Sequence, residues 1–173
     1  MVATDNKAIN EFVENVIYRL DENTRMISIA FDTLTEEQLW LRSNKASNSV
    51  GNLILHLCGN MTQYAISSLG ETEDVRDRDS EFETSSGLTK KELLSKLLNT
   101  VSDAKSTIEN ATIGQWLKKR DVQGFHFSGI GVILHVVEHY SYHTGQIAFW
   151  AKQLNNKALG FYDGIDLNIK NEE

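Results

Sequence analysis

Apolar residues recur at steps of three and four along four stretches of the chain, at about residues 5–34, 49–69, 89–110 and 128–154. This spacing places apolar side chains on one face of an α-helix. In the first and third stretches, charged residues fill the positions between the apolar ones. Four helices of this length predict an all-α fold, a four-helix bundle formed by a single domain over residues 1–173, with no strand.

Polar residues indicate where these helices begin and end. Asn48 or Ser49 can cap the second helix, and Gly70 can end it. Thr35 and Thr89 are each followed three residues later by Gln or Glu, the pattern of a capping box. The box at Thr35 predicts a short helical turn that carries Leu39 and Trp40, and Ser128 can cap the fourth long helix.

Two long connectors join the later helices. The connector at 71–87, which includes the run RDRDSEF, can cross the length of the bundle at up to ~3.3 Å per residue. The second and third helices can therefore run parallel, in an up-down-down-up arrangement. We expect the other connector, at 111–127, to be irregular and His126 in it to be an ordinary loop histidine.

Charged residues are almost absent from the second and fourth helices. Residues 46–70 contain none, although 24% of the chain is charged and about six would be expected in 25 positions. Residues 122–151 contain only Glu138. A helix whose faces are all uncharged is normally covered on every side. We therefore expect a homodimer that packs through the second and fourth helices, next to a small-molecule site.

Composition narrows the class of protein. The net charge of −7 argues against nucleic acid and against anionic membrane surfaces as partners. Polar residues within the second helix argue against a membrane span. A single cysteine, Cys58, excludes an internal disulfide, and the first residues lack the basic and apolar segments of a signal peptide. A cytoplasmic location is the expectation.

Three of the five histidines lie on one stripe of the fourth helix, because His135, His139 and His143 follow one another at steps of four. Two histidines at this spacing can hold one metal ion. All three cannot share one ion, since ~1.5 Å of rise per residue separates the outer two by about 12 Å. The spacing allows either adjacent pair, and a further ligand must come from elsewhere.

His56 is the candidate for that further ligand, because it lies on a narrow uncharged polar stripe of the second helix. On a wheel of 100° per residue, Asn52 and Asn60 share its face, whereas Cys58 points the opposite way and is expected in the core. On the fourth helix, Gln146 can orient a ligand, and Trp150 either closes one end of a pocket or fills the core.

The segments NSVGNLILHLCGN and HYSYHTGQI resemble the DinB-like metal-binding four-helix bundles, a superfamily that includes YfiT-like proteins. The likeness covers almost the whole chain, and RDRDSEF and LGFYDG are similar to a bacterial subfamily of uncharacterised function. The resemblance implies nickel or zinc as cofactor, with His56, His139 and His143 as ligands. It leaves His135 as a pocket neighbour, together with Asn60, Gln146, Asn52 and Trp150.

The resemblance also implies a choice of functions. Some members are thiol S-transferases that use bacillithiol or a similar low-molecular-weight thiol as co-substrate. A metal-dependent transferase or hydrolase acting on a small molecule is therefore one hypothesis, although Cys58, Gly59 and Asn60 stand where those transferases have an acidic residue and a histidine. Glu138 lies about 100° off the ligand face, so no general base is evident. The alternative is a non-catalytic dimeric module, with a stress-related role, that binds a metal or a small ligand.

Overall fold

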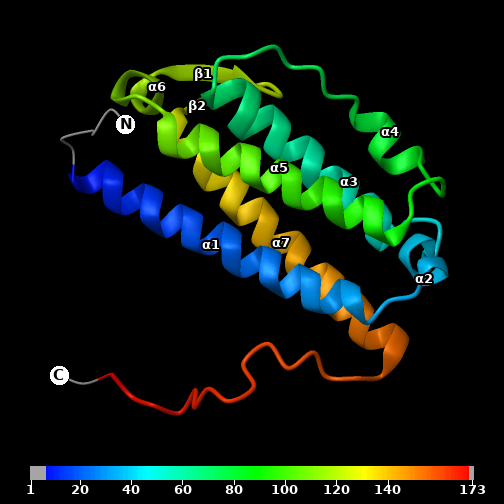
Figure 1. The fold of residues 1–173 in the computed structure, drawn as a ribbon. Helices are drawn as coiled ribbons and strands as arrows, with labels where there is room; N and C mark the ends of the chain where they lie inside the picture. Colours follow the sequence, from blue (N-terminus) through cyan, green and yellow to red (C-terminus); the bar gives the residue numbers. More distant parts are fainter. Residues whose placement is uncertain (1–6, 172–173) are drawn as a thin grey trace.

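Four long helices run the length of the molecule in the computed structural model, which describes residues 7–171 (Figure 1). They are α1 (Lys7–Asp32), α3 (Val50–Met61) with its π-helical continuation η1 (Thr62–Leu69), α5 (Lys90–Asn110) and α7 (Gly129–Asn155). The expected helices agree with these bounds to within two residues. Asp5 and Asn6, expected in the first helix, lie outside the described residues.

The helices form the expected bundle. In Figure 1, α3 and α5 run in the same direction, and α1 and α7 run opposite to them. The parallel pair requires a long crossover, which residues 71–87 supply by passing back along the outside of α3 (Figure 1). We call residues 71–87 the strap. The up-down-down-up four-helix bundle predicted from the sequence is thus confirmed.

Side-chain caps fix where several helices begin. Ser49 caps α3 and accepts a hydrogen bond from the Asn52 backbone, which settles the choice between Asn48 and Ser49. Thr35 caps the short helix α2 (Glu36–Trp40), and Thr89 caps α5, both in complete capping boxes. Each such cap contributes about 1 kcal/mol. The polar residues read from the sequence therefore mark the true helix starts.

The connectors contain more regular structure than expected. The strap holds a short helix, α4 (Arg78–Glu83), and the second connector holds α6 (Ile113–Leu117) and two antiparallel strands, β1 (Lys119–Val122) and β2 (Phe125–Ser128). The prediction of no strand was wrong here. The turn is Gln123–Gly124, both at positive φ, and a Gln-Gly pair is a weaker hairpin signal than Asn-Gly. His126 lies on β2, exposed, beside Asp121.

The protein itself covers α3, and this corrects the reason given for its lack of charge. Every residue from Val50 to Cys58 is buried, between α5, α7, the short helix α2 and the strap. No second molecule is needed to shield α3, and Cys58 lies in the core as expected. The outer face of α7 differs, because Leu134, Tyr142 and Phe149 keep 54, 62 and 60% of their surface exposed. None of the described helices is both long and apolar enough to span a bilayer.

Asn52 joins the strap to the bundle. Its buried amide nitrogen donates hydrogen bonds to the carbonyl oxygens of Glu81 at 3.0 Å and Thr84 at 2.6 Å, and its oxygen accepts one from Arg42 at 2.9 Å. The residue was expected to line the metal pocket, but its polar atoms are occupied by the cap of α3 and by the strap.

We predict that Asn52→Ala lowers the free energy of unfolding by about 2 kcal/mol, because it leaves buried carbonyl groups without donors. Chemical denaturation followed by circular dichroism measures the change. Asn99→Ala is the matched control, since Asn99 is exposed on α5, and it should stay within about 0.5 kcal/mol of the wild type. Equal stability of the two variants would show that Asn52 does not hold the strap.

Candidate metal centre

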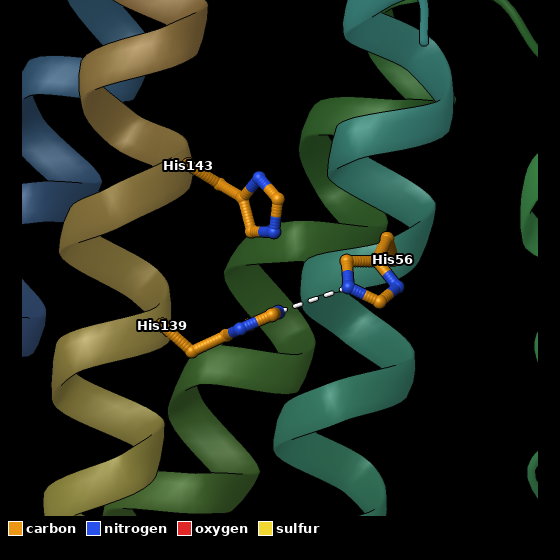
Figure 2. A group of neighbouring side chains, drawn as sticks. All are labelled: His56, His139 and His143. Carbon is orange, nitrogen blue, oxygen red and sulfur yellow. Dashed lines mark hydrogen bonds between the residues drawn. The ribbon is translucent and has the colours of Figure 1, made fainter. Parts of the chain in front are cut away.

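Three histidines from two helices converge inside the bundle. His56 on α3 faces His139 and His143 on α7 (Figure 2), and one ring nitrogen from each lies within 4.8 Å of the others. The Nε2 atoms of His56 and His139 are 2.9 Å apart. Two bare nitrogen lone pairs at this distance would repel each other, so either a proton or a cation must lie between them.

His135, the third histidine of α7, lies beside this group. His135 stacks on the ring of Tyr64, with 4.3 Å between ring centroids, and its Nε2 lies 3.2 Å from the amide nitrogen of Asn60. Helix spacing had allowed either His135 with His139 or His139 with His143 as the pair that binds a metal ion. The structure groups His139 and His143 with His56, and Asn60 contacts His135, the neighbour.

In His56 and His143, the ring nitrogen that points away from the group, Nδ1, contacts a hydrogen-bond acceptor. Nδ1 of His143 lies 2.7 Å from Oε1 of Gln146, and Nδ1 of His56 lies 2.8 Å from Oε2 of Glu81. An acceptor at Nδ1 selects the tautomer that carries its proton there and leaves Nε2 free to bind a cation. Gln146 therefore takes the orienting position that the sequence suggested for it.

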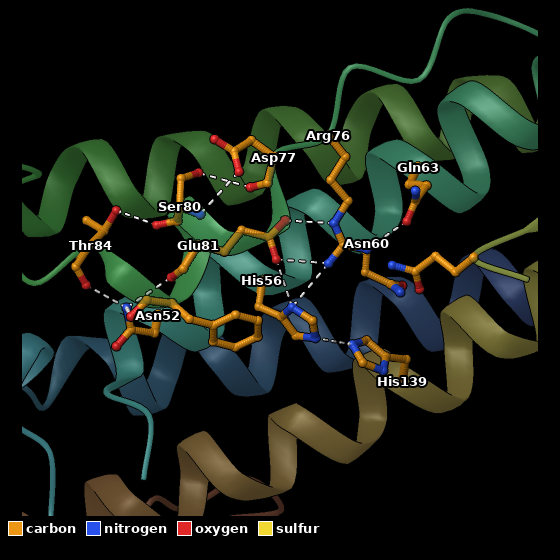
Figure 3. A network of polar contacts seen from close by, with 12 residues as sticks. Asn52, His56, Asn60, Gln63, Arg76, Asp77, Ser80, Glu81, Thr84 and His139 are labelled. Atoms are coloured by element: carbon orange, nitrogen blue, oxygen red, sulfur yellow. Dashed lines mark hydrogen bonds and ion pairs between the residues drawn. The ribbon is translucent and has the colours of Figure 1, made fainter. Parts of the chain in front are cut away.

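Glu81 reaches His56 from the strap and is held by Arg76 (Figure 3). Arg76 donates from Nε to one carboxylate oxygen at 2.7 Å and from Nη2 to the other at 2.9 Å. The exposed fractions of the Arg76, Glu81 and His56 side chains are only 3, 7 and 8%. Loss of one partner from a buried pair of this kind typically costs about 3–5 kcal/mol.

The surroundings keep Glu81 ionised. Burial on its own would raise the pKa of this carboxyl group, but the hydrogen bonds from Arg76 and His56 outweigh burial and lower the pKa. The group is therefore a carboxylate at neutral pH. A carboxylate only accepts hydrogen bonds, so the contact with His56 requires the proton on Nδ1 of the imidazole.

The two α7 histidines of the group are held uncharged. Burial and the neighbouring imidazole rings lower the pKa of His139 to about 3. Burial also lowers the pKa of His143, although the hydrogen bond to Gln146 opposes the shift. Neutral imidazole is the form that binds a metal ion, so neither ring has to give up a positive charge before it coordinates.

Sequence reasoning missed Glu81 and Arg76. Both lie within the run RDRDSEF, which had no assigned role. One signal was present in the sequence: α3 has no charge of its own, so any ion pair to its histidine had to come from another segment. Glu138, the only charge on α7 before its last turn, is exposed.

Trp150 is partly buried and packs against the hydrophobic core. Its indole nitrogen is inaccessible to solvent and has no hydrogen-bond partner among residues 7–171. Of the two roles that the sequence suggested, core filling agrees better with these contacts than closing a polar pocket.

The donor set fits a divalent cation. Three imidazoles, with two outer nitrogens already occupied by acceptors, are the ligand type and support typical of zinc and nickel sites. Glu81 is not available as a further ligand in this arrangement, because its two oxygens are engaged by Arg76 and His56 on the outer side of the imidazole.

Two solved structures from Bacillus subtilis share this fold. The structure of YfiT, described as a probable metal-dependent hydrolase with an unusual four-helix bundle topology, aligns with a TM-score of 0.68 and 17% identity over 89% of this chain and 92% of that one. The structure of YjoA, described as a DinB-like protein, aligns with a TM-score of 0.66 and 14% identity over 86% and 96% of the two chains. Identities this low show the fold alone.

A search of functionally curated proteins finds no match. A family model does match, over residues 7–162, and its description is a protein of unknown function, DUF1572. That match spans all four long helices, the strap and the three histidines. The chain therefore belongs to the DUF1572 family, and its fold is that of the DinB-like four-helix bundles.

Proposed function

We propose that this protein is an enzyme that depends on a divalent metal ion, nickel or zinc, held by His56, His139 and His143. The observation that carries the proposal is the convergence of three imidazoles from two helices, within 4.8 Å of one another and supported by Glu81 and Gln146. The description of YfiT as a probable metal-dependent hydrolase agrees with this assignment.

A divalent ion with three imidazole ligands and an open position would lower the pKa of a bound water or thiol to near neutrality. Glu81 cannot take up a proton at that open position, because it contacts the opposite nitrogen of His56. No carboxylate therefore stands beside the three-histidine group as a general base among the described residues. A low-molecular-weight thiol needs less help from a base than water does, which favours thiol S-transfer over hydrolysis.

The protein's own residues would bind and orient the small-molecule substrate next to this group. His135 and Asn60 form a polar wall beside His139. Polar groups next to the three histidines suit a compact, partly polar electrophile.

We further propose that the chain forms a homodimer through the outer face of α7. Leu134, Tyr142 and Phe149 lie within about 80° of one another on this helix, and all three are exposed. Glu138 is the only acidic residue on the same face. An exposed apolar stripe that includes aromatic residues is typical of an interface between subunits.

Metal content tests the proposed site. Protein purified without a metal-affinity tag should contain about one nickel or zinc ion per chain by elemental analysis, because three neutral imidazoles are offered to one ion. His139→Ala removes one of those ligands and should reduce the content to near zero.

His126→Ala is the control for that experiment. His126 is exposed on the hairpin, where its Nδ1 lies 2.7 Å from Oδ1 of Asp121, and it is not one of the three clustered histidines. This variant should keep the full metal content. Wild-type protein that stays free of metal in the presence of equimolar nickel or zinc would overturn the proposal. Metal-loaded protein that fails to conjugate electrophiles with bacillithiol, glutathione or coenzyme A would remove the preference for thiol transfer.

Sedimentation tests the proposed dimer. At micromolar concentration the wild type should sediment as a dimer, and Phe149→Glu should shift it toward the monomer, because the new charge would be buried in the interface. Leu98→Glu places the same charge on the exposed face of α5 and should leave the dimer intact. A wild-type monomer under these conditions would contradict the prediction.

A further inference from the structure

We propose that Glu81 is a positioning residue that fixes the tautomer of His56, so that Nε2 of this histidine points toward His139 and His143 and is free to bind the metal ion. This inference rests on the proposed function, because it concerns the same three-histidine group. It assigns a role to the strap, which reaches the group from outside the four long helices (Figure 3).

The hydrogen bonds around Glu81 determine which nitrogen of His56 carries the proton. The two oxygens accept from Arg76 at 2.7 and 2.9 Å, and the second also accepts from Nδ1 of His56 at 2.8 Å. Arg76 always donates, so the shared carboxylate is an acceptor for both neighbours. Nη2 of Arg76 also lies 3.1 Å from Nδ1 of His56, farther than the carboxylate oxygen at 2.8 Å, and the same Nη2 donates to that oxygen. The nearer, negatively charged acceptor places the imidazole proton on Nδ1, and the lone pair then lies on Nε2.

Contacts of the strap with α3 and η1 hold Glu81 in place. Arg76, which precedes α4, donates a further hydrogen bond from Nη1 to Gln63 at 2.9 Å, and Asn52 donates to the backbone of Glu81 and Thr84. The ring of Phe82 lies against His56, with 4.8 Å between ring centroids. These contacts leave the carboxylate little freedom to turn away from the imidazole.

Gly59 makes room for this carboxylate on the surface of α3. A Cβ atom at Gly59 would lie 1.8 Å from Oε1 of Glu81 and 2.9 Å from Nε of Arg76. No side chain can therefore occupy this position while Glu81 and Arg76 keep their places. Gly59 itself contributes no donor to the metal ion, so its substitution tests the position of Glu81 without changing any ligand.

The tautomer can be observed directly in the wild-type protein. Long-range ¹H–¹⁵N correlation spectra of protein without metal distinguish a protonated Nδ1 from a protonated Nε2. We expect the proton of His56 on Nδ1. A wild-type protein whose His56 carries its proton on Nε2 overturns the inference, and this result requires neither metal nor a variant.

Metal affinity measured by chelator competition, with Ni²⁺ or Zn²⁺ as the probe, gives a second readout. Glu81→Leu, which removes the acceptor at Nδ1, and Gly59→Ala should each weaken binding by about 10–100-fold, as is typical when the partner of a metal-binding histidine is lost. Glu83→Gln, on the exposed side of the same short helix, should leave the affinity unchanged. Far-ultraviolet circular dichroism of each variant shows that the helices are intact.

The outcomes separate this inference from the proposed function. Tight binding by the wild type together with equal affinity in folded Glu81→Leu overturns the role of Glu81 and leaves the metal site standing. A wild type that binds neither ion but carries the His56 proton on Nδ1, and loses that preference in Glu81→Leu, overturns the metal site and supports the role of Glu81. If the two variants do not fold, the wild-type spectrum alone decides.

Discussion

The ion pair between Arg76 and Glu81 is the interaction on which the arrangement of the strap and the three-histidine group depends. A carboxylate can be buried beside a helix only if its charge is matched, and Arg76 provides both the charge and two hydrogen bonds. One of the two carboxylate oxygens, Oε2, also lies against Nδ1 of His56. The need to match the buried charge of Glu81 thus links the strap to the interior of the bundle. His56 is positioned by the strap as well as by its own helix, α3.

This arrangement explains why α3 can lack charges without being a membrane span or an interface. Its polar side chains are used internally, by the Ser49 cap, by Asn52 beneath the strap and by Asn60 beside His135. Burial on all sides is normally a property of helices inside larger proteins. Here a bundle of modest size achieves it because the parallel topology of α3 and α5 requires a crossover, and that crossover lies over the face of α3 that would otherwise meet water.

Sequence periodicity predicted the four long helices, their caps and the bundle, since amphipathic spacing and capping residues are local signals. Sequence periodicity also identified His56 and the three histidines of α7 as candidate ligands. The family resemblance was needed to choose His139 and His143 over His135 and His139. The periodicity did not predict Glu81, because the contact between residues 56 and 81 depends on how the strap folds back, and no local pattern encodes that path. The hairpin at 119–128 was not predicted for another reason. Its strands have only four residues each, which is too short to show a clear alternation of polar and apolar positions.

The contact between Gly59 and Glu81 has a consequence for how this family can diverge. A side chain at position 59 and a carboxylate at position 81 would compete for the same space, so the two positions are not free to change independently. A relative that gains even alanine at the first position must also shorten the residue at the second or move its crossover outward. The two positions are therefore sterically coupled, and the glycine at position 59 leaves the space that an acidic side chain on the crossover needs.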